Sequence, residues 1–347
     1  MDAPLDRRRR TTARRRAECP HAEDLGAEAL HSVSGGSSGP VVAAGAVVWR
    51  EQDGVPLVLL IHRDHHKDVS FPKGKVDPGE SVPTTAVREI HEETGYRVHL
   101  GAPLGTAEYV LPSGRDKIVH YWSARVSSKE FERAGRFRPN DEVASVEWVT
   151  LDDARHRLTY DRDVAILDRF AERVAAGEHR TFALIALRHA KTVPGSDWDG
   201  PDATRPLLPV GRSQAKAVAA PVAAFGPKKI VSSTAARCLA TVEPLSDRTR
   251  LGVSSTPDIS QDAHDRGAAN VKGVVQKRLE KAKSTVLCSH GPVLPDIIAR
   301  IATATADDSG RFDLRRAAML SVGDFAVMHI ADGKLVAVET HRNTIPA

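Results

Sequence analysis

The segment from 74 to 96 constrains the fold of this chain more strongly than any other. A turn-rich stretch, FPKGKVDPGES, leads into a helical pattern over 81–94, with a serine that can cap its start and a glycine just past its end. At about 100° per residue, Glu89, Glu92 and Glu93 share one helix face, and apolar residues occupy the neighbouring face. Like charges at these spacings oppose helix formation, so we expect a divalent cation such as Mg²⁺ or Mn²⁺ to neutralise them.

The spacing within this segment is highly specific. It fits the pattern G-x5-E-x7-R-E-U-x-E-E-x-G-U over 23 residues and departs from it only at the last position, where a tyrosine replaces a smaller aliphatic residue. The matching residues are Gly74, Glu80, Arg88, Glu89, Ile90, Glu92, Glu93, Gly95 and Tyr96. The first part of the chain therefore resembles the Nudix hydrolases, and the resemblance implies an α/β/α sandwich with a mixed sheet over residues 40–177.

The resemblance also implies roles for the acidic residues. Glu89 or Glu142 would be the general base that helps a metal-activated water attack a phosphorus of a nucleoside polyphosphate. We choose Glu142 because it lies six residues before Trp148, and Glu147 is the less favoured candidate. The implied catalytic carboxylates are those of Glu89, Glu93 and Glu142. The implied metal ligands are the carbonyl of Gly74 and the carboxylates of Glu89, Glu92, Glu93 and Glu142.

Three further residues belong to the implied site. By resemblance, Arg88 would orient a glutamate through an ion pair and lie with the phosphate-binding residues, and Glu80 would support the loop before the helix. That loop contains the sequence FPKG, which is similar to the loop of diadenosine and inositol polyphosphate hydrolases. Lys73 in this loop is either a point charge that contacts phosphate or an ordinary loop lysine.

The second half of the chain has a different pattern. Short apolar runs alternate with helical stretches, which indicates an α/β domain with a mostly parallel sheet. The runs cover 181–187, 229–232 and 284–288, the helical stretches cover 211–224, 235–247 and 269–282, and a final hairpin is expected from 324–330 and 334–339.

Basic residues and histidines follow these runs. Arg188 and His189 follow the first run, Arg237 the second and His290 the third, and the carboxyl ends of parallel strands are where ligand sites form. Arginines for charge and an imidazole as nucleophile suit a phosphoryl group. The set resembles the histidine phosphatase superfamily, which implies that His189 and His290 are catalytic and that Arg188 and Arg237 bind phosphate. Many members carry a glutamate as general acid, whereas 257–262 offers glutamine or aspartate, so this half is either an active phosphatase or a domain that only binds phosphate.

Length and composition favour two globular domains. The chain has 347 residues, of which 41% are hydrophobic and 27% charged, and no apolar run approaches the ~18 residues of a membrane span. Seven arginines within 7–16 indicate either an arm for nucleic acid or, as we favour, a disordered extension. We therefore expect a flexible basic tail over 1–39 and domains over 40–177 and 178–347. Three separated cysteines argue against a disulfide framework and favour a cytoplasmic setting.

The order of the two halves resembles the mycobacterial MutT proteins, which remove oxidised guanine nucleotides. This resemblance implies hydrolysis of a nucleotide substrate, 8-oxo-(d)GTP, to the diphosphate or to the monophosphate, with Mg²⁺ or Mn²⁺ as cofactor. We favour the diphosphate because the loop that contains Lys73 suits a grip on a long phosphate chain. Two alternatives stay open: asymmetric cleavage of diadenosine polyphosphates by the first half, and dephosphorylation of phosphohistidine by the second.

Overall fold

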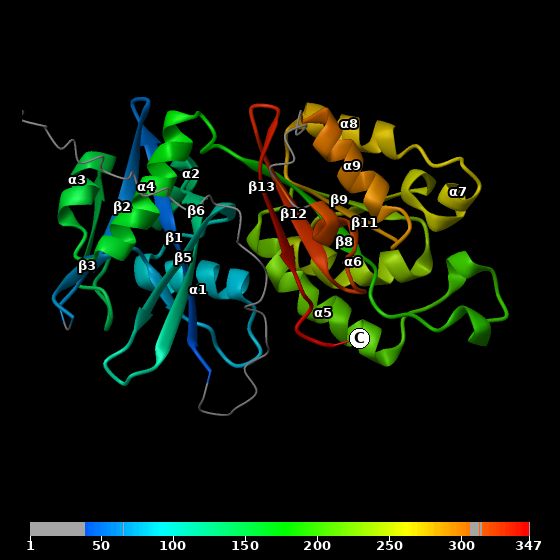
Figure 1. The fold of residues 1–347 in the computed structure, drawn as a ribbon, viewed down its shortest axis with the longest axis horizontal. Coiled ribbons are helices and arrows are strands. Elements are labelled where there is room, and N and C mark those ends of the chain that lie inside the picture. The colour runs from blue at the N-terminus through cyan, green and yellow to red at the C-terminus, as the bar shows by residue number, and fades with distance from the viewer. Residues whose placement is uncertain (1–38, 65, 306–311, 313, 347) are drawn as a thin grey trace, which may run out of the picture.

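The computed structural model describes residues 39–64, 66–305, 312 and 314–346, and the basic run at 7–16 and Cys19 lie outside them. The described chain forms two β-sheets, each flanked by helices, that lie side by side (Figure 1). The strands of one sheet end at Val149, and those of the other begin at Phe182.

The first sheet is mixed, as the resemblance implies. Its main path is β3-β2-β1-β6-β5, with β4 paired to β1 and β7 paired to β2. β1 and β6 run parallel, and the other pairings are antiparallel. The strands are β1 (Val41–Gln52), β2 (Val55–Arg63), β3 (Asp68–Ser70), β4 (Lys73–Lys75), β5 (Leu100–Val110), β6 (Asp116–Arg125) and β7 (Ser145–Val149). The helices are α1 (Val82–Thr94), α2 (Ser128–Ala134), α3 (Leu151–Arg157) and α4 (Asp161–Ala175).

The second sheet follows the order β10-β9-β11-β8-β12-β13. Its first four strands run parallel, and β12 and β13 complete it as antiparallel strands. The strands are β8 (Phe182–Arg188), β9 (Lys229–Ser233), β10 (Val253–Thr256), β11 (Thr285–Ser289), β12 (Phe325–Ala331) and β13 (Lys334–His341). The helices are α5 (Pro209–Ala224), α6 (Ala236–Thr249), α7 (Gln261–Asp265), α8 (Val271–Lys281), α9 (Leu294–Ala304) and α10 (Leu314–Ala318), with short 3-10 turns at Gly195–Asp197, Asp202–Thr204 and Pro257–Ile259.

Helix α1 begins and ends where its sequence predicts. The Ser81 side chain accepts a hydrogen bond from the amide of Thr84 at the start, and Gly95 closes the end in the left-handed region at φ 77°. Ala86 and Ile90 are fully buried on the face that turns toward the sheet. The glutamates are thereby held on the side of α1 that meets β4 and the loop before β7.

Strand β5 is the main element that the sequence pattern does not predict. Gly101, Pro103 and Gly105 interrupt its apolar residues, and such residues are typical of turns rather than strands. In the structure they coincide with two breaks in the pairing of β5 with β6, around Pro103. The strand tolerates them because the irregular register absorbs them.

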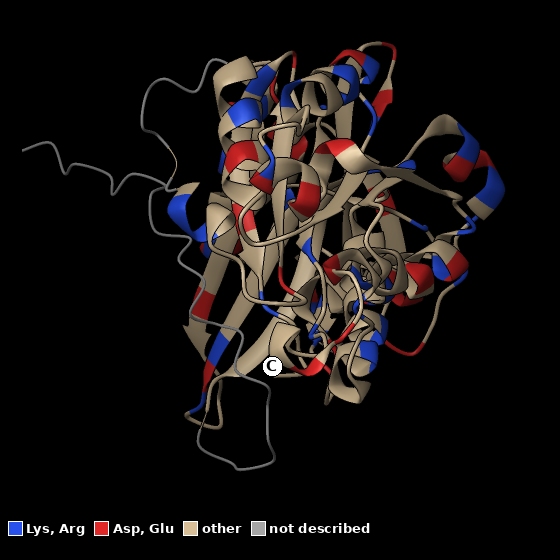
Figure 2. Ribbon diagram, turned by 90° about the vertical axis from the view of Figure 1, so that its right-hand side faces the viewer, with Lys and Arg blue, Asp and Glu red and all other residues tan. Residues whose placement is uncertain are grey.

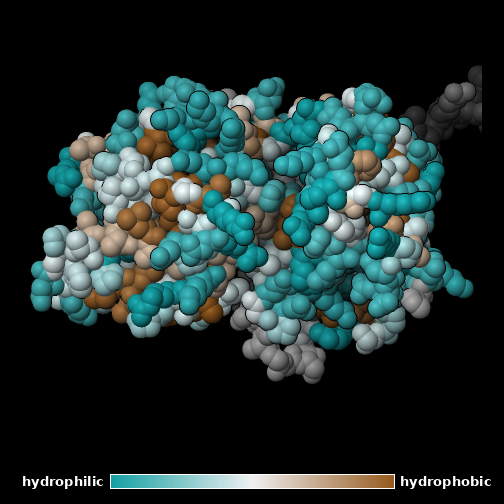
Figure 3. Space-filling model, turned by 180° about the vertical axis from the view of Figure 1, so that it is seen from behind, coloured by the Kyte–Doolittle hydropathy of each residue, from teal (hydrophilic) through white to brown (hydrophobic). Residues whose placement is uncertain are grey.

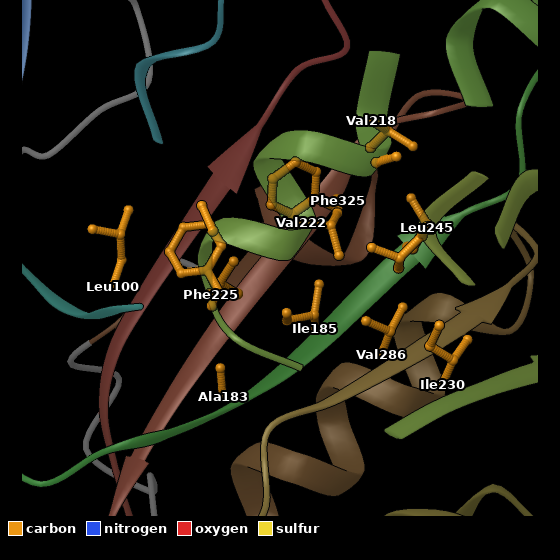
Figure 4. Close-up of a cluster of buried hydrophobic side chains, with 14 of the residues drawn as sticks. Leu100, Ala183, Ile185, Val218, Val222, Phe225, Ile230, Leu245, Val286 and Phe325 are labelled. Carbon is orange, nitrogen blue, oxygen red and sulfur yellow. The ribbon is translucent and has the colours of Figure 1, made fainter. Parts of the chain in front are cut away.

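The two halves share one hydrophobic cluster. Leu100 and Trp122 of the first half belong to the same buried cluster as Ile185, Phe225 and other residues of the second half. Figure 4 shows Leu100 at one edge of this cluster. The indole nitrogen of Trp122 also donates to both carboxylate oxygens of Glu339, at 3.1 and 3.3 Å. The halves therefore pack against one another through both apolar and polar contacts.

The surface of the molecule is mixed in character. Figure 2 shows basic and acidic residues interspersed over one side. Figure 3, seen from behind the view of Figure 1, shows hydrophilic residues over most of that face and hydrophobic residues gathered over part of its left half. A cleft of about 670 Å³ lies between the halves and includes Arg125, Arg180 and Lys228 in its lining, but none of the predicted catalytic residues. Within the described ranges, no helix is long and apolar enough to cross a membrane.

Candidate active sites

Three of the predicted metal ligands meet beside α1. One carboxylate oxygen from each of Glu89, Glu93 and Glu142 lies within 4.8 Å of the others, with the first two residues buried and Glu142 exposed. Glu93 Oε2 accepts a hydrogen bond from the amide of Lys73 at 2.8 Å, whereas Glu93 Oε1 is buried without a partner. A buried carboxylate oxygen with no donor is unfavourable, and hard divalent cations take oxygen ligands of this kind. The residues present therefore fit a divalent metal ion.

The electrostatics of the cluster agree with this assignment. Burial raises the pKa of Glu93 to about 7, although the charge of Lys73 and its amide hydrogen bond oppose the shift. Burial also raises the pKa of Glu89, against the effect of Arg88. Burial therefore outweighs the nearby positive charges at both glutamates, and a bound cation would stabilise their ionised forms.

Gly74 lies against the carboxylate of Glu89. A Cβ atom at position 74 would fall 1.9 Å from Glu89 Cδ, so any side chain there would displace the glutamate. This close approach explains why position 74, in β4, requires a glycine. The role of the Gly74 carbonyl as a metal ligand stays a prediction.

Arg88 draws several acidic residues together. Its guanidinium donates to Glu80 at 2.8 Å, to Glu89 at 2.8 Å and to Glu92 at 2.9 Å, and also to the carbonyl of Lys75 at 3.0 Å. Glu92 is therefore paired with Arg88 and more than half exposed, outside the group formed by the other three carboxylates. Its assignment as a metal ligand stays a prediction, as does phosphate contact by Arg88. Glu80 lies where a support for the loop is expected, because it holds Arg88 from the residue before the helix cap.

The loop before β7 is held to the end of α1 by Asn140. Its side-chain amide donates to the carbonyl of Glu92 at 3.1 Å, and its Oδ1 accepts from the amides of Glu142 at 3.0 Å and of the next residue at 2.8 Å. The alternative candidate, Glu147, instead bonds to His62 at 2.8 Å. The sequence analysis missed Asn140, because a single asparagine in a loop carries no motif.

Basic side chains gather next to the buried glutamate. Lys73 is buried, and burial lowers its pKa. The charge of Glu93 opposes this shift, and the charge of Arg63 adds to it. Burial lowers the pKa of Lys117 to about 8, and the charges of Lys73 and other nearby cations lower it further. The guanidinium of Arg162 lies 4.0 Å from the ring centroid of Tyr109. Only Lys73 of this basic cluster (Arg63, Lys73, Lys117 and Arg162) is predicted from the sequence.

His189 lies at the end of β8, where the carbonyl of the next residue fixes its ring. Its Nδ1 lies 2.8 Å from the carbonyl of Ala190, and because a carbonyl can only accept, Nδ1 carries the proton. Nε2 then has a free lone pair. Burial lowers the pKa of His189 to about 4, and the charges of Arg237 and Arg188 act in the same direction. The imidazole is therefore neutral and nucleophilic near pH 7.

His290 lies beside His189, and Arg237 bonds to His290. The ring centroids of His189 and His290 are 5.2 Å apart, and the Nε of Arg237 donates to His290 Nδ1 at 3.3 Å. His290 Nε2 then carries the proton and donates to Ser233 at 2.9 Å. Burial lowers the pKa of His290 to about 3, and the charge of Arg237 acts in the same direction. The structure thus brings together the two predicted histidines and one predicted arginine.

Arg188 is the fourth member of the predicted set. One of its terminal nitrogens donates to the carbonyl of Leu320 at 2.7 Å, and its Nε is buried without a partner. A Cβ at Gly291 would approach the guanidinium to 3.0 Å, so a larger residue after His290 would require the Arg188 side chain to shift. Phosphate binding by Arg188 and Arg237 stays a prediction.

Asp202 is hydrogen-bonded to Arg237, and the sequence analysis did not identify it. Arg237 donates through one terminal nitrogen to the Asp202 carbonyl and through the other to its carboxylate, both at 2.7 Å. Arg205 donates to the same carboxylate at 2.8 Å. Gln261 lies 3.4 Å from Arg237 on another side. Asp202 lies 13 residues after His189 and does not follow a buried strand, so no sequence pattern indicates it.

Comparisons with known proteins decide the family. The NUDIX domain family matches residues 39–170, and the histidine phosphatase superfamily, branch 1, matches residues 184–261. A relative named 8-oxo-(d)GTP phosphatase, from Mycolicibacterium smegmatis, is 36% identical over 293 residues, which is 81% of this chain and 84% of that protein. The chain belongs to the two-domain Nudix hydrolases. It is a hydrolytic enzyme, and the predicted order of the two domain types is confirmed.

Other relatives cover mainly one half. The putative mutator protein MutT4 of Mycobacterium tuberculosis is 31% identical over 43% of this chain, and the match spans 58% of that protein. An asymmetrical bis(5'-nucleosyl)-tetraphosphatase from Caenorhabditis elegans is 28% identical over 38% of this chain and 94% of its own length. The first half of this chain is therefore similar to proteins that are named for different activities.

Proposed function

We propose that the Nudix half hydrolyses 8-oxo-(d)GTP to the diphosphate with release of orthophosphate. The observation that carries this proposal is the convergence of Glu89, Glu93 and Glu142 next to a buried lysine, Lys73. It is supported by the likeness, over most of the chain, to the relative named 8-oxo-(d)GTP phosphatase. The substrate is then a nucleotide whose phosphate chain lies between the carboxylates and the basic cluster.

The cofactor in this proposal is Mg²⁺ or Mn²⁺. Glu89, Glu93 and Glu142 would hold it, and when bound it would polarise the phosphate chain and lower the pKa of water. Glu89 already accepts a hydrogen bond from Arg88, whereas Glu142 is exposed on its loop. We therefore assign the general base to Glu142, which would take a proton from the attacking water.

The basic cluster would hold the phosphate chain. Lys73, Lys117 and Arg162 place like charges near one another, and burial followed by these charges lowers the pKa of Lys117 to about 8. An anionic chain of phosphates would relieve this repulsion and pair with the lysines as point charges. Release of the terminal phosphate is favoured because the cluster offers several cations to the part of the chain that remains on the nucleotide.

Diadenosine polyphosphates are the second candidate substrate. Arg162 lies 4.0 Å from the ring centroid of Tyr109 and 3.8 Å from that of Tyr160, so two aromatic rings flank the basic cluster. Rings of this kind can stack with a second nucleobase. The likeness to the relative named asymmetrical bis(5'-nucleosyl)-tetraphosphatase supports this candidate.

The second half is proposed to be a phosphatase with His189 as nucleophile. Its free Nε2 and the neighbouring Arg237 and His290 support this assignment. We also propose a cytoplasmic location, which agrees with the free buried thiols of Cys238 and Cys288. The domain limits 40–177 and 178–347 and the flexible tail over 1–39 are likewise proposals.

A substrate comparison tests the proposed activity. Purified enzyme with Mg²⁺ is given 8-oxo-dGTP, dGTP and diadenosine tetraphosphate, and the nucleotide and phosphate products are separated and quantified. We expect the highest kcat/KM for 8-oxo-dGTP, with the diphosphate and orthophosphate as products. A higher kcat/KM for the dinucleotide would assign the site to the second candidate substrate, and the monophosphate with pyrophosphate would contradict the proposed bond cleavage.

A further inference from the structure

A basic groove, here the α8 groove, lies at the edge of the second sheet that β10 forms. Its volume is about 750 Å³, with α8 on one side and strands β9, β10 and β11 on the other. The cationic side chains that line it are Lys228, Lys229, Lys277, Arg278, Lys281 and Lys283, and the one carboxylate in the lining is that of Asp258. None of the catalytic or metal-binding residues named above belongs to this lining.

The strand side of the α8 groove carries hydroxyl groups and an ammonium group. Strand register places Ser254 of β10 opposite Val231 of β9, and Val231 belongs to the same buried cluster as Val275 of α8. Side chains alternate along a strand, so Thr256 and Lys229, each two residues from these positions, lie on the same face. The ammonium of Lys229 donates to the hydroxyl of Ser254. The strands therefore present polar donors beneath α8.

The helix side of the α8 groove is a charged stripe. Lys277 and Arg278 lie one turn before Lys281, so the three share the face that lines the groove. Lys272 falls on the opposite face of the same helix, outside the lining. The carbonyl end of a helix attracts cations, which accounts for Arg278 and Lys281 but not for the lysines on the strand side. Lys277 and Lys281 repel one another at a spacing of four residues.

The cations of the α8 groove have no carboxylate partners among the residues that the structure describes. None of the six forms an ion pair, whereas Arg205 and Arg300, elsewhere in the second half, are paired with aspartates. Glu280 on α8 instead accepts a hydrogen bond from Gln276 at 3.1 Å. The Nε of Arg278 is buried without a hydrogen-bond partner. An anion in the groove would supply the missing negative charge and an acceptor.

The lining discriminates among anionic ligands. It contains no aromatic side chain, and its only apolar side chains are those of Val231 and Val274. Single-stranded nucleic acids stack their bases on aromatic rings, and bound peptides place side chains in pockets. A nucleic-acid duplex is too broad to enter a concave site of this volume. Ammonium, guanidinium and hydroxyl donors without rings suit phosphate groups alone.

We propose that the α8 groove binds linear polyphosphate, a chain of phosphate groups without a base. This site goes beyond the activities proposed for the two halves, because it uses none of their residues. The lining stripe from Asn270 to Lys281 extends about 16 Å along the helix axis, at about 1.5 Å per residue. Several phosphates of an extended chain can therefore contact the stripe and the hydroxyl groups opposite it.

Calorimetric titration of the full chain, after removal of divalent metals, tests the proposal. The ligands are orthophosphate, pyrophosphate, tripolyphosphate and a longer polyphosphate, and without metal the Nudix half does not hydrolyse them. We expect the affinity to rise with chain length and to fall with added salt, since cations that pair with phosphates release counterions. An affinity that is the same for orthophosphate and the longest chain would overturn the proposal.

Two double variants localise the binding. Lys277→Gln with Lys281→Gln removes two exposed ammonium groups from the groove, and it should weaken tripolyphosphate binding at least about tenfold. Lys216→Gln with Lys272→Gln makes the same change of charge at exposed positions outside the groove, and its affinity should stay within about twofold of wild type. Denaturant unfolding checks that both variants fold. Equal affinities in the two variants would overturn the proposal.

Lysine acetylation gives an independent location for the ligand. The protein is treated with an acetylating reagent with and without tripolyphosphate, and the modified lysines are quantified by mass spectrometry. We expect tripolyphosphate to protect Lys277 and Lys281 and to leave Lys272 unprotected. Equal protection of the three lysines, or none, would contradict binding in the α8 groove.

Competing anions test the class of ligand. Single-stranded DNA and polyglutamate, each matched in charge to the longer polyphosphate, are titrated against wild type and the Lys277→Gln, Lys281→Gln variant. We expect both to bind at least about tenfold more weakly than polyphosphate, because the lining has neither rings for bases nor apolar pockets. If either anion binds as tightly as polyphosphate and loses affinity in the variant, the groove is a nucleic-acid or general anion site and the proposal is wrong.

Discussion

Arg88 and Gly74 determine which carboxylates remain for a cation. Arg88 pairs with Glu92 and with one oxygen of Glu89, and Glu93 keeps a buried oxygen without a donor. Gly74 leaves the space into which the Glu89 carboxylate fits. At this scale the carboxylate group depends on the hydrogen bonds of Arg88 and on the space left at Gly74.

Gly74→Ala should therefore impair the Nudix half severely. The added methyl group would lie 1.9 Å from Glu89 Cδ, so the glutamate must move out of the group it forms with Glu93 and Glu142. We expect kcat/KM for nucleotide hydrolysis to fall at least about 10²-fold, with a stability loss of about 1–3 kcal/mol. Steady-state kinetics and denaturant unfolding measure both.

Gly252→Ala is the matched control for this substitution. A Cβ at Gly252 meets nothing within 4 Å, and its backbone does not require a glycine. Its kcat/KM should stay within twofold of wild type. Normal activity in Gly74→Ala would show that Glu89 is not confined as the structure indicates.

Sequence motifs predict site residues that lie in or near one short segment. They do not predict residues that reach the site only because distant parts of the chain pack together. Glu89, Glu93 and Glu142 were expected together, and the structure brings them together. Asp202 and Lys117 were not expected, because each reaches its site only through tertiary packing. Nothing in their local sequence distinguishes them from other exposed or strand residues.

At the scale of elements, the loop before β7 is positioned by helix α1. Asn140 ties the carbonyl of Glu92 to the amide of Glu142, so the helix end and the loop move together. The caps of α1 were predicted from Ser81 and Gly95, whereas β5 was not predicted because its glycines and proline imitate a turn. Elements with a clear periodicity were predictable, and those stabilised mainly by their neighbours were not.

Asn140→Ala should loosen the loop and slow the reaction. It removes three hydrogen bonds that fix Glu142 relative to α1. We expect kcat to fall about tenfold or more, since a misplacement of about 1 Å can cost 10²-fold, with KM changed less. Asn140→Asp keeps the acceptor for both loop amides and should retain more activity, and equal losses in the two variants would contradict this role.

At the scale of the whole molecule, a buried carboxylate joins the halves. Glu339 accepts from Trp122 of the first half and bonds to His329 at 2.7 Å and His341 at 3.0 Å in its own half. Burial alone would raise the pKa of Glu339, but these histidines lower it to about 2. Burial lowers the pKa of the nearby His120 to about 4. Sequence patterns predict each half but not this junction.

The stability of the junction should therefore decline in acid in two stages. The neutral form of His120 stabilises the fold fully above pH 6.5, and this contribution, up to about 3 kcal/mol, is lost as the pH falls toward 4. The contribution of ionised Glu339 is present above about pH 4.5 and is lost as the pH falls toward 2. Denaturant unfolding between pH 8 and 4 measures the first stage, and His120→Phe should flatten it. An unchanged slope in that variant would assign the acid sensitivity to another group.

The measurement that tests the account most directly follows 8-oxo-dGTP hydrolysis with Mg²⁺ in wild type, Glu93→Gln and His189→Ala. Glu93 belongs to the carboxylate group of the Nudix half, and His189 lies at the end of β8 in the second half. We predict that Glu93→Gln lowers formation of the diphosphate at least about 10³-fold and that His189→Ala leaves its initial rate unchanged. Diphosphate formation that persists in Glu93→Gln, or that is lost in His189→Ala, would contradict the assignment of this reaction to the Nudix half.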